Sequence, residues 1–158
     1  MKKILFVVLL QSLVVCGFGQ EKKPTKVETM DWIGSKMKEH LAAPRQFISY
    51  SNGLFIYKKE TKAGVYCTST VDLNKLTGIS DEYSSDFYVF GKILTHSVCP
   101  GDEYGTDYDY ISISGPNYDD HSVPFDFNMD NILLERIRKA FTTLMEYNAA
   151  KKGSDEAF

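Results

Sequence analysis

Histidine and cysteine are the side chains from which many metal-binding and catalytic motifs are built. His40, His96 and His121 stand singly, and the sequence contains neither a C-x-x-C nor an H-E-x-x-H motif. His96 and Cys99 are three residues apart, a spacing that sends two side chains of one strand to opposite faces. We therefore predict no catalytic residue, metal or cofactor. One alternative stays open, a small hydrolase that uses His96 with an acidic residue from 102–120.

Between Lys92 and Arg136 the chain contains no Lys or Arg, while acidic residues and tyrosines alternate there. Tyrosine offers rigid contact area with a polar tip, and clustered carboxylates attract a basic partner or a hard cation. The candidate recognition residues are Tyr104, Asp107, Tyr108, Asp109, Tyr110, Tyr118, Asp119 and Asp120. Two other interpretations remain: a solvated hairpin whose acids prevent edge pairing, and a calcium site, although the EF-hand glycine and terminal glutamate are missing.

The first residues have the three parts of a secretory signal peptide. Lys2 and Lys3 precede an apolar run from Ile4 to Val15, and Gly17-Phe18-Gly19 supplies a small-x-small cleavage site. This pattern predicts a signal peptide over 1–19 and export to the periplasm or the extracellular medium. Cys16 offers an alternative, because Leu13-Val14-Val15-Cys16 resembles a lipobox apart from Val15, and acylation there would anchor the protein to the envelope.

Cys67 and Cys99 are the cysteines that remain after cleavage. In an oxidising compartment such a pair predicts a disulfide, and the alternative is two buried free thiols.

The composition limits the remaining function classes. The 158 residues suit a single domain, and a net charge of −3 argues against a nucleic-acid partner. No later segment is apolar enough to span a membrane.

A first helix is predicted over 26–41. Thr25 and Glu28 have the spacing of a capping box, and Pro44 ends the helical pattern. Gly34 weakens this helix by about 1 kcal/mol relative to alanine. The apolar residues at helical spacing are Val27, Met30, Ile33, Met37 and Leu41.

About seven strands follow. Asn52-Gly53 predicts a tight hairpin between strands 46–50 and 54–57. The further strands are expected at 64–69, 87–90, 92–98, 108–114 and 123–127, where 87–98 is either two strands or one strand bent at Gly91. Residues 71–76 are interpreted as a loop or a short turn of helix.

The last element is a long helix over about 129–151. Asn128 or Asp130 can cap its start, and Gly153 is placed to stop it. Its predicted buried stripe is Leu133, Ile137, Ala140, Phe141 and Leu144, while Glu135, Arg136, Lys139 and Glu146 face water.

These elements predict an α+β fold, a bent antiparallel sheet or half-barrel with a long C-terminal amphipathic helix packed on it. The domain limits are 1–19 signal peptide, 20–25 lead-in, 26–152 domain and 153–158 tail. This order of strands and a final helix resembles the pleckstrin-homology-like superfold. Segments 29–33 and 134–141 resemble small secreted bacterial proteins of unknown function. The resulting prediction is an exported, non-catalytic module that binds a partner protein or a small ligand.

Overall fold

The computed structural model describes residues 22–83, 86–101, 105–113, 124–127 and 130–155. The predicted signal peptide, Cys16 and His121 lie outside these ranges, as do the candidate recognition residues Tyr104, Tyr118, Asp119 and Asp120.

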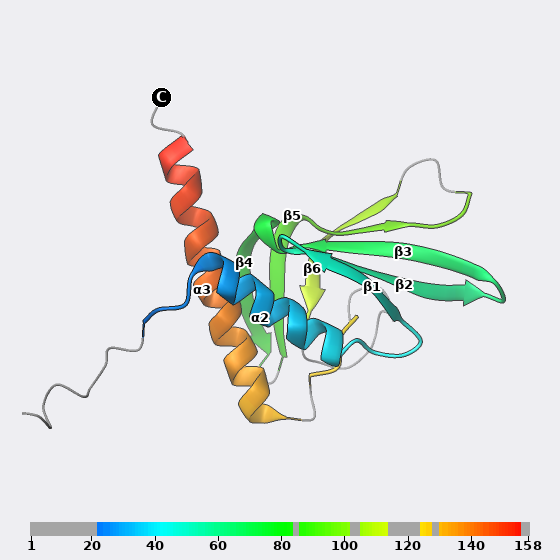
Figure 1. Cartoon of the computed structure of the whole chain (residues 1–158), viewed down its shortest axis with the longest axis horizontal. Helices are drawn as coiled ribbons and strands as arrows, with labels where there is room; N and C mark the ends of the chain where they lie inside the picture. Colours follow the sequence, from blue (N-terminus) through cyan, green and yellow to red (C-terminus); the bar gives the residue numbers. More distant parts are fainter. Residues whose placement is uncertain (1–21, 84–85, 102–104, 114–123, 128–129, 156–158) are drawn as a thin grey trace, which may run out of the picture.

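The described chain is an α+β fold with one antiparallel sheet and two long helices (Figure 1). Helix α2 (Lys26–Glu39) precedes the sheet, and helix α3 (Asn131–Asp155) follows it. The strands are β1 (Gln46–Ser51), β2 (Leu54–Lys62), β3 (Val65–Asp72), β4 (Leu76–Tyr83), β5 (Asp86–Val98) and β6 (Thr106–Ser112), with a short 3-10 helix η2 (Leu73–Lys75) between β3 and β4. Strand order is β1-β2-β3-β5-β4, and β6 pairs with β5.

The sheet bends at Gly91, in the middle of β5. The first half of β5 pairs with β4, and its last residues pair with β3, with a shift of register between Phe90 and Thr95 on the side of β6. A Cβ atom at Gly91 would lie 2.2 Å from the carbonyl oxygen of Lys75, so only glycine allows this approach. Of the two alternatives for 87–98, the structure has the single bent strand.

Local sequence signals account for both the hairpin and the helix starts. Asn52 and Gly53 have φ angles of 52° and 81°, and they connect β1 to β2 as predicted. The capping box of α2 is complete, because the backbone N–H of Thr25 donates to Glu28 (2.7 Å) and that of Glu28 donates to the Thr25 hydroxyl (3.2 Å). Of the two proposed caps of α3 it is Asp130 that accepts from Ile132 and Leu133, at 2.9 and 3.0 Å.

One strand was missed by the sequence analysis, and one predicted strand does not join the sheet. Residues 76–83 form strand β4, which the sequence hides because Thr77, Gly78 and Ser80 break the apolar pattern. Within 123–127, the described residues 124–127 do not join the sheet. Phe125 instead forms an isolated bridge with Leu41, and Pro124 has no N–H to donate to a ladder.

Three details of the helices also differ from the prediction. Helix α2 ends at Glu39 rather than 41, because His40 donates from Nδ1 to the carbonyl oxygen of Asp126 at 2.9 Å. Val27 is 60% exposed rather than part of the buried stripe, since the first turn of α2 lies at the edge of the sheet beside α3 (Figure 1). Helix α3 continues through Gly153 to Asp155.

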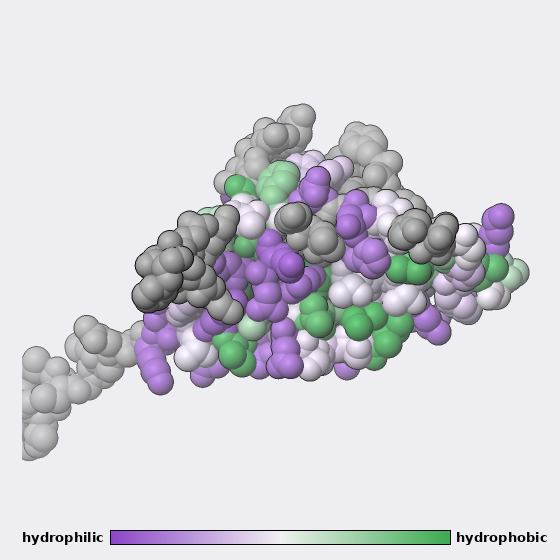
Figure 2. Space-filling model, turned by 90° about the horizontal axis from the view of Figure 1, so that it is seen from above, coloured by the Kyte–Doolittle hydropathy of each residue, from purple (hydrophilic) through white to green (hydrophobic). Residues whose placement is uncertain are grey.

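The core lies between the two helices and the inner face of the sheet. Phe55 and Phe125 pack edge to face, 5.7 Å between ring centroids, and α3 contributes Ile137, Phe141 and Leu144. This is the predicted stripe of the last helix. Most of the exposed large hydrophobic side chains belong to strands. Figure 2 shows a group of hydrophilic residues on part of one face, with hydrophobic and hydrophilic residues interspersed elsewhere on it.

Asn148 ties α3 to the end of the sheet. Its side-chain nitrogen donates to the carbonyl oxygens of Leu73 and Leu76, at 3.1 and 3.0 Å. This contact fixes the C-terminal half of α3 on η2 and the start of β4.

Cys67 and Cys99 form a disulfide that joins β3 to the end of β5. The neighbouring pair Thr68 and Val98 are register partners, so the two cysteines lie directly opposite each other. Ser69 and Ser97 form the register pair that follows Thr68 and Val98. The hydroxyl of Ser69 donates to that of Ser97 at 3.1 Å, and both serines are buried.

Reduction of this disulfide should lower the free energy of unfolding by about 3–4 kcal/mol on the chain-entropy estimate, because the bridge closes a loop with a sequence separation of 32. Urea titrations with and without reductant measure the loss. A Cys67→Ala/Cys99→Ala variant is the control, because reductant should not change its stability. In the protein that begins at Gln20, two titratable thiols in the unreduced, unfolded state would contradict the bridge.

Gly34→Ala should destabilise the protein by about 1–2 kcal/mol, although alanine is the better helix former. A Cβ atom there would lie 2.5 Å from the Tyr50 ring, and the Tyr50 hydroxyl is fixed by donation to Asp31 at 3.1 Å. Thermal and urea unfolding measure the change, and Ser35→Ala on the exposed side of the same helix is the control. A Gly34→Ala protein as stable as the parent would show that Tyr50 does not pack there.

Candidate functional site

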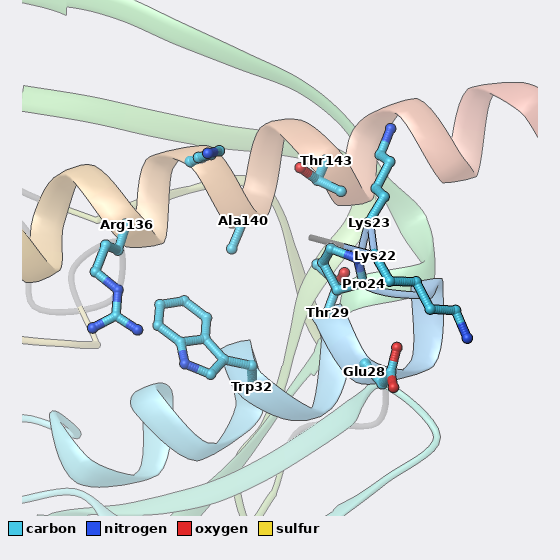
Figure 3. A pocket seen from close by; sticks show the side chains of 10 residues that line it. Lys22, Lys23, Pro24, Glu28, Thr29, Trp32, Arg136, Ala140 and Thr143 are labelled. Atoms are coloured by element: carbon cyan, nitrogen blue, oxygen red, sulfur yellow. The ribbon is translucent and has the colours of Figure 1, made fainter. Parts of the chain in front are cut away.

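A groove runs between α2, α3 and the segment that leads into α2 (Figure 3). Its volume is about 920 Å³, which lies within the range of roughly 300–1,000 Å³ for small-molecule sites. The lining residues are Lys22, Lys23, Pro24, Glu28, Thr29, Trp32, Arg136, Lys139, Ala140 and Thr143.

Trp32 supplies the apolar wall from α2. The buried face of α2 holds Met30, Ile33 and Met37, and Trp32 lies to one side of it, half-buried and directed toward α3 (Figure 3). Arg136 places its guanidinium 5.3 Å from the centroid of the Trp32 ring. This cation–π contact holds the indole and leaves a cation at the rim of the groove.

The wall from α3 consists of residues three or four positions apart. Arg136, Lys139, Ala140 and Thr143 therefore share one side of the helix, next to the stripe that faces the core. The small side chain of Ala140 leaves the groove open, because a larger side chain there would fill the space in front of Trp32 (Figure 3).

The third wall is the lead-in segment, which contacts α3 at three points. The Tyr147 hydroxyl donates to the carbonyl oxygen of Pro24 at 2.7 Å, Lys23 pairs with Glu146 at 2.9 Å, and the Lys23 ammonium lies 5.3 Å from the Tyr147 ring centroid. The hydrogen bond to Glu146 raises the pKa of Lys23. These contacts place Lys22–Pro24 opposite Trp32.

The groove carries an excess of positive charge. Four of its residues are basic, and Glu28 is the one acid among them. The backbone N–H of Thr25, and then its hydroxyl, donate to the Glu28 carboxylate and lower its pKa, so this acid is already bound within the capping box. Lys139 forms no ion pair with any residue that the structure describes.

A second, smaller hollow of about 490 Å³ lies between α2 and β1. Tyr50 is one of its lining residues, packed on Gly34 and hydrogen-bonded to Asp31. Burial, and secondly the bond to Asp31, raise the pKa of Tyr50. The arrangement holds α2 on the sheet.

The sequence-predicted recognition residues that the structure describes lie elsewhere, on β6. Asp107, Asp109 and Tyr110 are exposed there, and Tyr108 belongs to the same strand. The Tyr110 ring lies 5.9 Å from Tyr88 and 6.2 Å from Phe90 between centroids. Recognition at this strand remains a prediction.

His96 on β5 contacts the carboxylate of Asp107 on β6 through Nδ1. This is the histidine–acid pair that the hydrolase alternative required. The two side chains are 41% and 44% exposed, and neither lines the groove or the smaller hollow. Within the described ranges no group of three or more His, Cys, Asp or Glu side chains is placed to hold a metal ion.

Sequence reasoning did not identify the groove. Its walls come from segments about a hundred positions apart, so no local motif contains it. Two signals were present: Trp32 is the single tryptophan and lies beside the apolar stripe, and the water-facing side of the last helix held Arg136 and Lys139.

Tyr147→Phe should loosen the lead-in segment, because it removes the hydrogen bond to Pro24 and keeps the ring. A hydrogen bond contributes about 0.5–1.5 kcal/mol net to holding the segment in place. If the segment must detach from α3 before trypsin can cut it, loss of this bond should make cleavage after Lys22 roughly two- to tenfold faster. Mass spectrometry of timed digests measures the rate, with Tyr66→Phe on β3 as control. Equal rates in both variants and the parent would mean that the segment is not held by Tyr147.

Comparison with known proteins adds no family: no family model, curated protein or solved structure matches the chain. Among the described residues, no helix is long and apolar enough to cross a membrane.

Proposed function

We propose that the chain is an exported, non-catalytic module that binds a small ligand in the groove between α2 and α3. The observation that carries this proposal is Trp32, a large aromatic side chain left half-buried at the wall of a groove of about 920 Å³. An apolar wall with a few convergent polar groups is the usual composition of a ligand site.

Export is proposed from the basic start, apolar run and small-x-small ending of residues 1–19. The disulfide is compatible with an oxidising compartment. Lipid anchoring through Cys16 is the alternative, which mass spectrometry of the mature N-terminus distinguishes from an N-terminus at Gln20. We also propose, from the order of the elements and from segments 29–33 and 134–141, that the chain is related to small secreted bacterial proteins and to the pleckstrin-homology-like superfold.

A hydrolase remains the second candidate, and the contact between His96 and Asp107 favours it. The groove has the stronger support, because it combines concavity, an aromatic wall and uncompensated charge, whereas the histidine–acid pair lies on an exposed sheet surface. Protein recognition at β6 would use a different surface and is compatible with either candidate.

Blocking the groove should weaken ligand binding without unfolding the protein. Thr143 lines the groove and Thr142, its neighbour on α3, is exposed. We expect Thr143→Tyr to weaken the binding of the fluorescent probe 1-anilinonaphthalene-8-sulfonate at least about tenfold, because the ring occupies the space in front of Trp32. Thr142→Tyr should change it less than about twofold.

Dye emission measures the affinity, and energy transfer from Trp32, the single tryptophan, reports the location. Far-UV circular dichroism confirms that both variants are folded. Equal probe affinity in the two variants, or saturable binding without energy transfer, would place the binding site elsewhere and refute the proposed function.

A further inference from the structure

We infer that the groove selects an amphiphilic oxyanion: a carboxylate or phosphate monoester on a short apolar body, taken from solution. This inference rests on the proposed function and adds the chemical class of the ligand. Charge, shape and the arrangement of the walls support it.

The charge of the groove favours an anion. Arg136 and Lys139 are one turn apart on α3, so a single oxyanion can reach both. The Arg136 guanidinium lies 5.3 Å from the centroid of the Trp32 ring and forms no ion pair with any residue that the structure describes, so its N–H groups can donate to a ligand. Lys139 has no ion-pair partner among the described residues. The other basic residues are partly compensated: Lys23 pairs with Glu146, and Lys22 lies close enough to Glu28 to lower its pKa.

The apolar surface of the groove favours a ligand that also has an apolar part. Trp32, Ala140 and the ring of Pro24 supply apolar lining, and they lie between Arg136 on one side and Lys22 and Lys23 on the other (Figure 3). An inorganic anion would leave this surface wet, and an uncharged hydrocarbon would leave Arg136 and Lys139 without an acceptor. A molecule with an anionic head and an apolar body satisfies both.

The walls favour a free small molecule over a membrane surface. The groove is bounded on three sides by α2, α3 and the lead-in segment, and the lead-in is held by Tyr147 and Glu146. A lipid headgroup within a bilayer would have to enter between these walls together with its neighbours, whereas a single amphiphile fits within about 920 Å³.

A matched series of eight-carbon ligands tests the inference. Octanoate, octyl phosphate, octanamide and octylammonium share one apolar body and differ in the head group. Titrations follow the emission of Trp32, which reports the groove alone because the chain has no other tryptophan. We expect octanoate and octyl phosphate to bind at least about tenfold more tightly than octanamide, which is the order of a charge-assisted hydrogen bond, and octylammonium to bind no better than octanamide.

Lys139→Met removes the charge and keeps the length of the side chain. It should weaken octanoate about three- to tenfold and leave octanamide unchanged. Lys62→Met on β2 is the matched control, because it changes the net charge equally and lies outside the groove. The preference for octanoate should also fall as salt rises from 0.05 to about 0.5 M, since the cations are at the surface.

The possible failures are distinguishable. If neither the four ligands nor vesicles of anionic phospholipid change Trp32 emission, the groove is not a ligand site and the proposed function fails with the inference. If octanamide binds as tightly as octanoate, or Lys62→Met weakens octanoate as much as Lys139→Met does, the proposed function stands and anion selection fails. If only vesicles of anionic phospholipid change the emission, the groove recognises a membrane and the inference of a soluble ligand is wrong.

Discussion

The burial of one face of α3 is the constraint on which the rest of the structure depends. Ile137, Phe141 and Leu144 are held against the core, and Asn148 fixes the same helix on the carbonyl groups of Leu73 and Leu76. Once this face is fixed, the adjacent side of α3 must face α2. The groove is therefore a consequence of core packing: residues such as Lys139, which cannot be buried, are held beside a tryptophan on the neighbouring helix.

The elements that could be predicted from sequence are those whose signal is local. Asn52-Gly53 favours a tight hairpin whatever surrounds it, and the capping box of α2 and the helical stripes depend on residues at most a few turns apart. The disulfide was one of two alternatives, because spacing alone does not tell whether β3 and β5 are neighbours. The strand at 76–83 was missed because its signal is not local. Strand β4 is polar and has few β-branched residues. It is a strand because β5 pairs with it and α3 covers it.

The candidate site was missed because it is entirely tertiary. Trp32 and Arg136 come from opposite ends of the described chain, and their contact follows from the packing of α2 on α3. The segment between Lys92 and Arg136 was predicted to be a recognition surface because it is rich in acidic residues and tyrosines and has no Lys or Arg. An unusual composition identifies a segment, whereas a binding site requires side chains to converge. Of the predicted set, β6 carries four consecutive residues, 107–110, on one described strand.

The most direct test of the account is nuclear magnetic resonance of the Trp32 indole N–H, which gives a single resonance because the chain has one tryptophan. On titration with octanoate, the account predicts a saturable shift of this resonance together with the backbone amides of Arg136, Lys139 and Ala140. A ligand that binds with comparable affinity while these resonances stay in place, and others on the sheet move, would contradict the claim that the groove between α2 and α3 is the binding site.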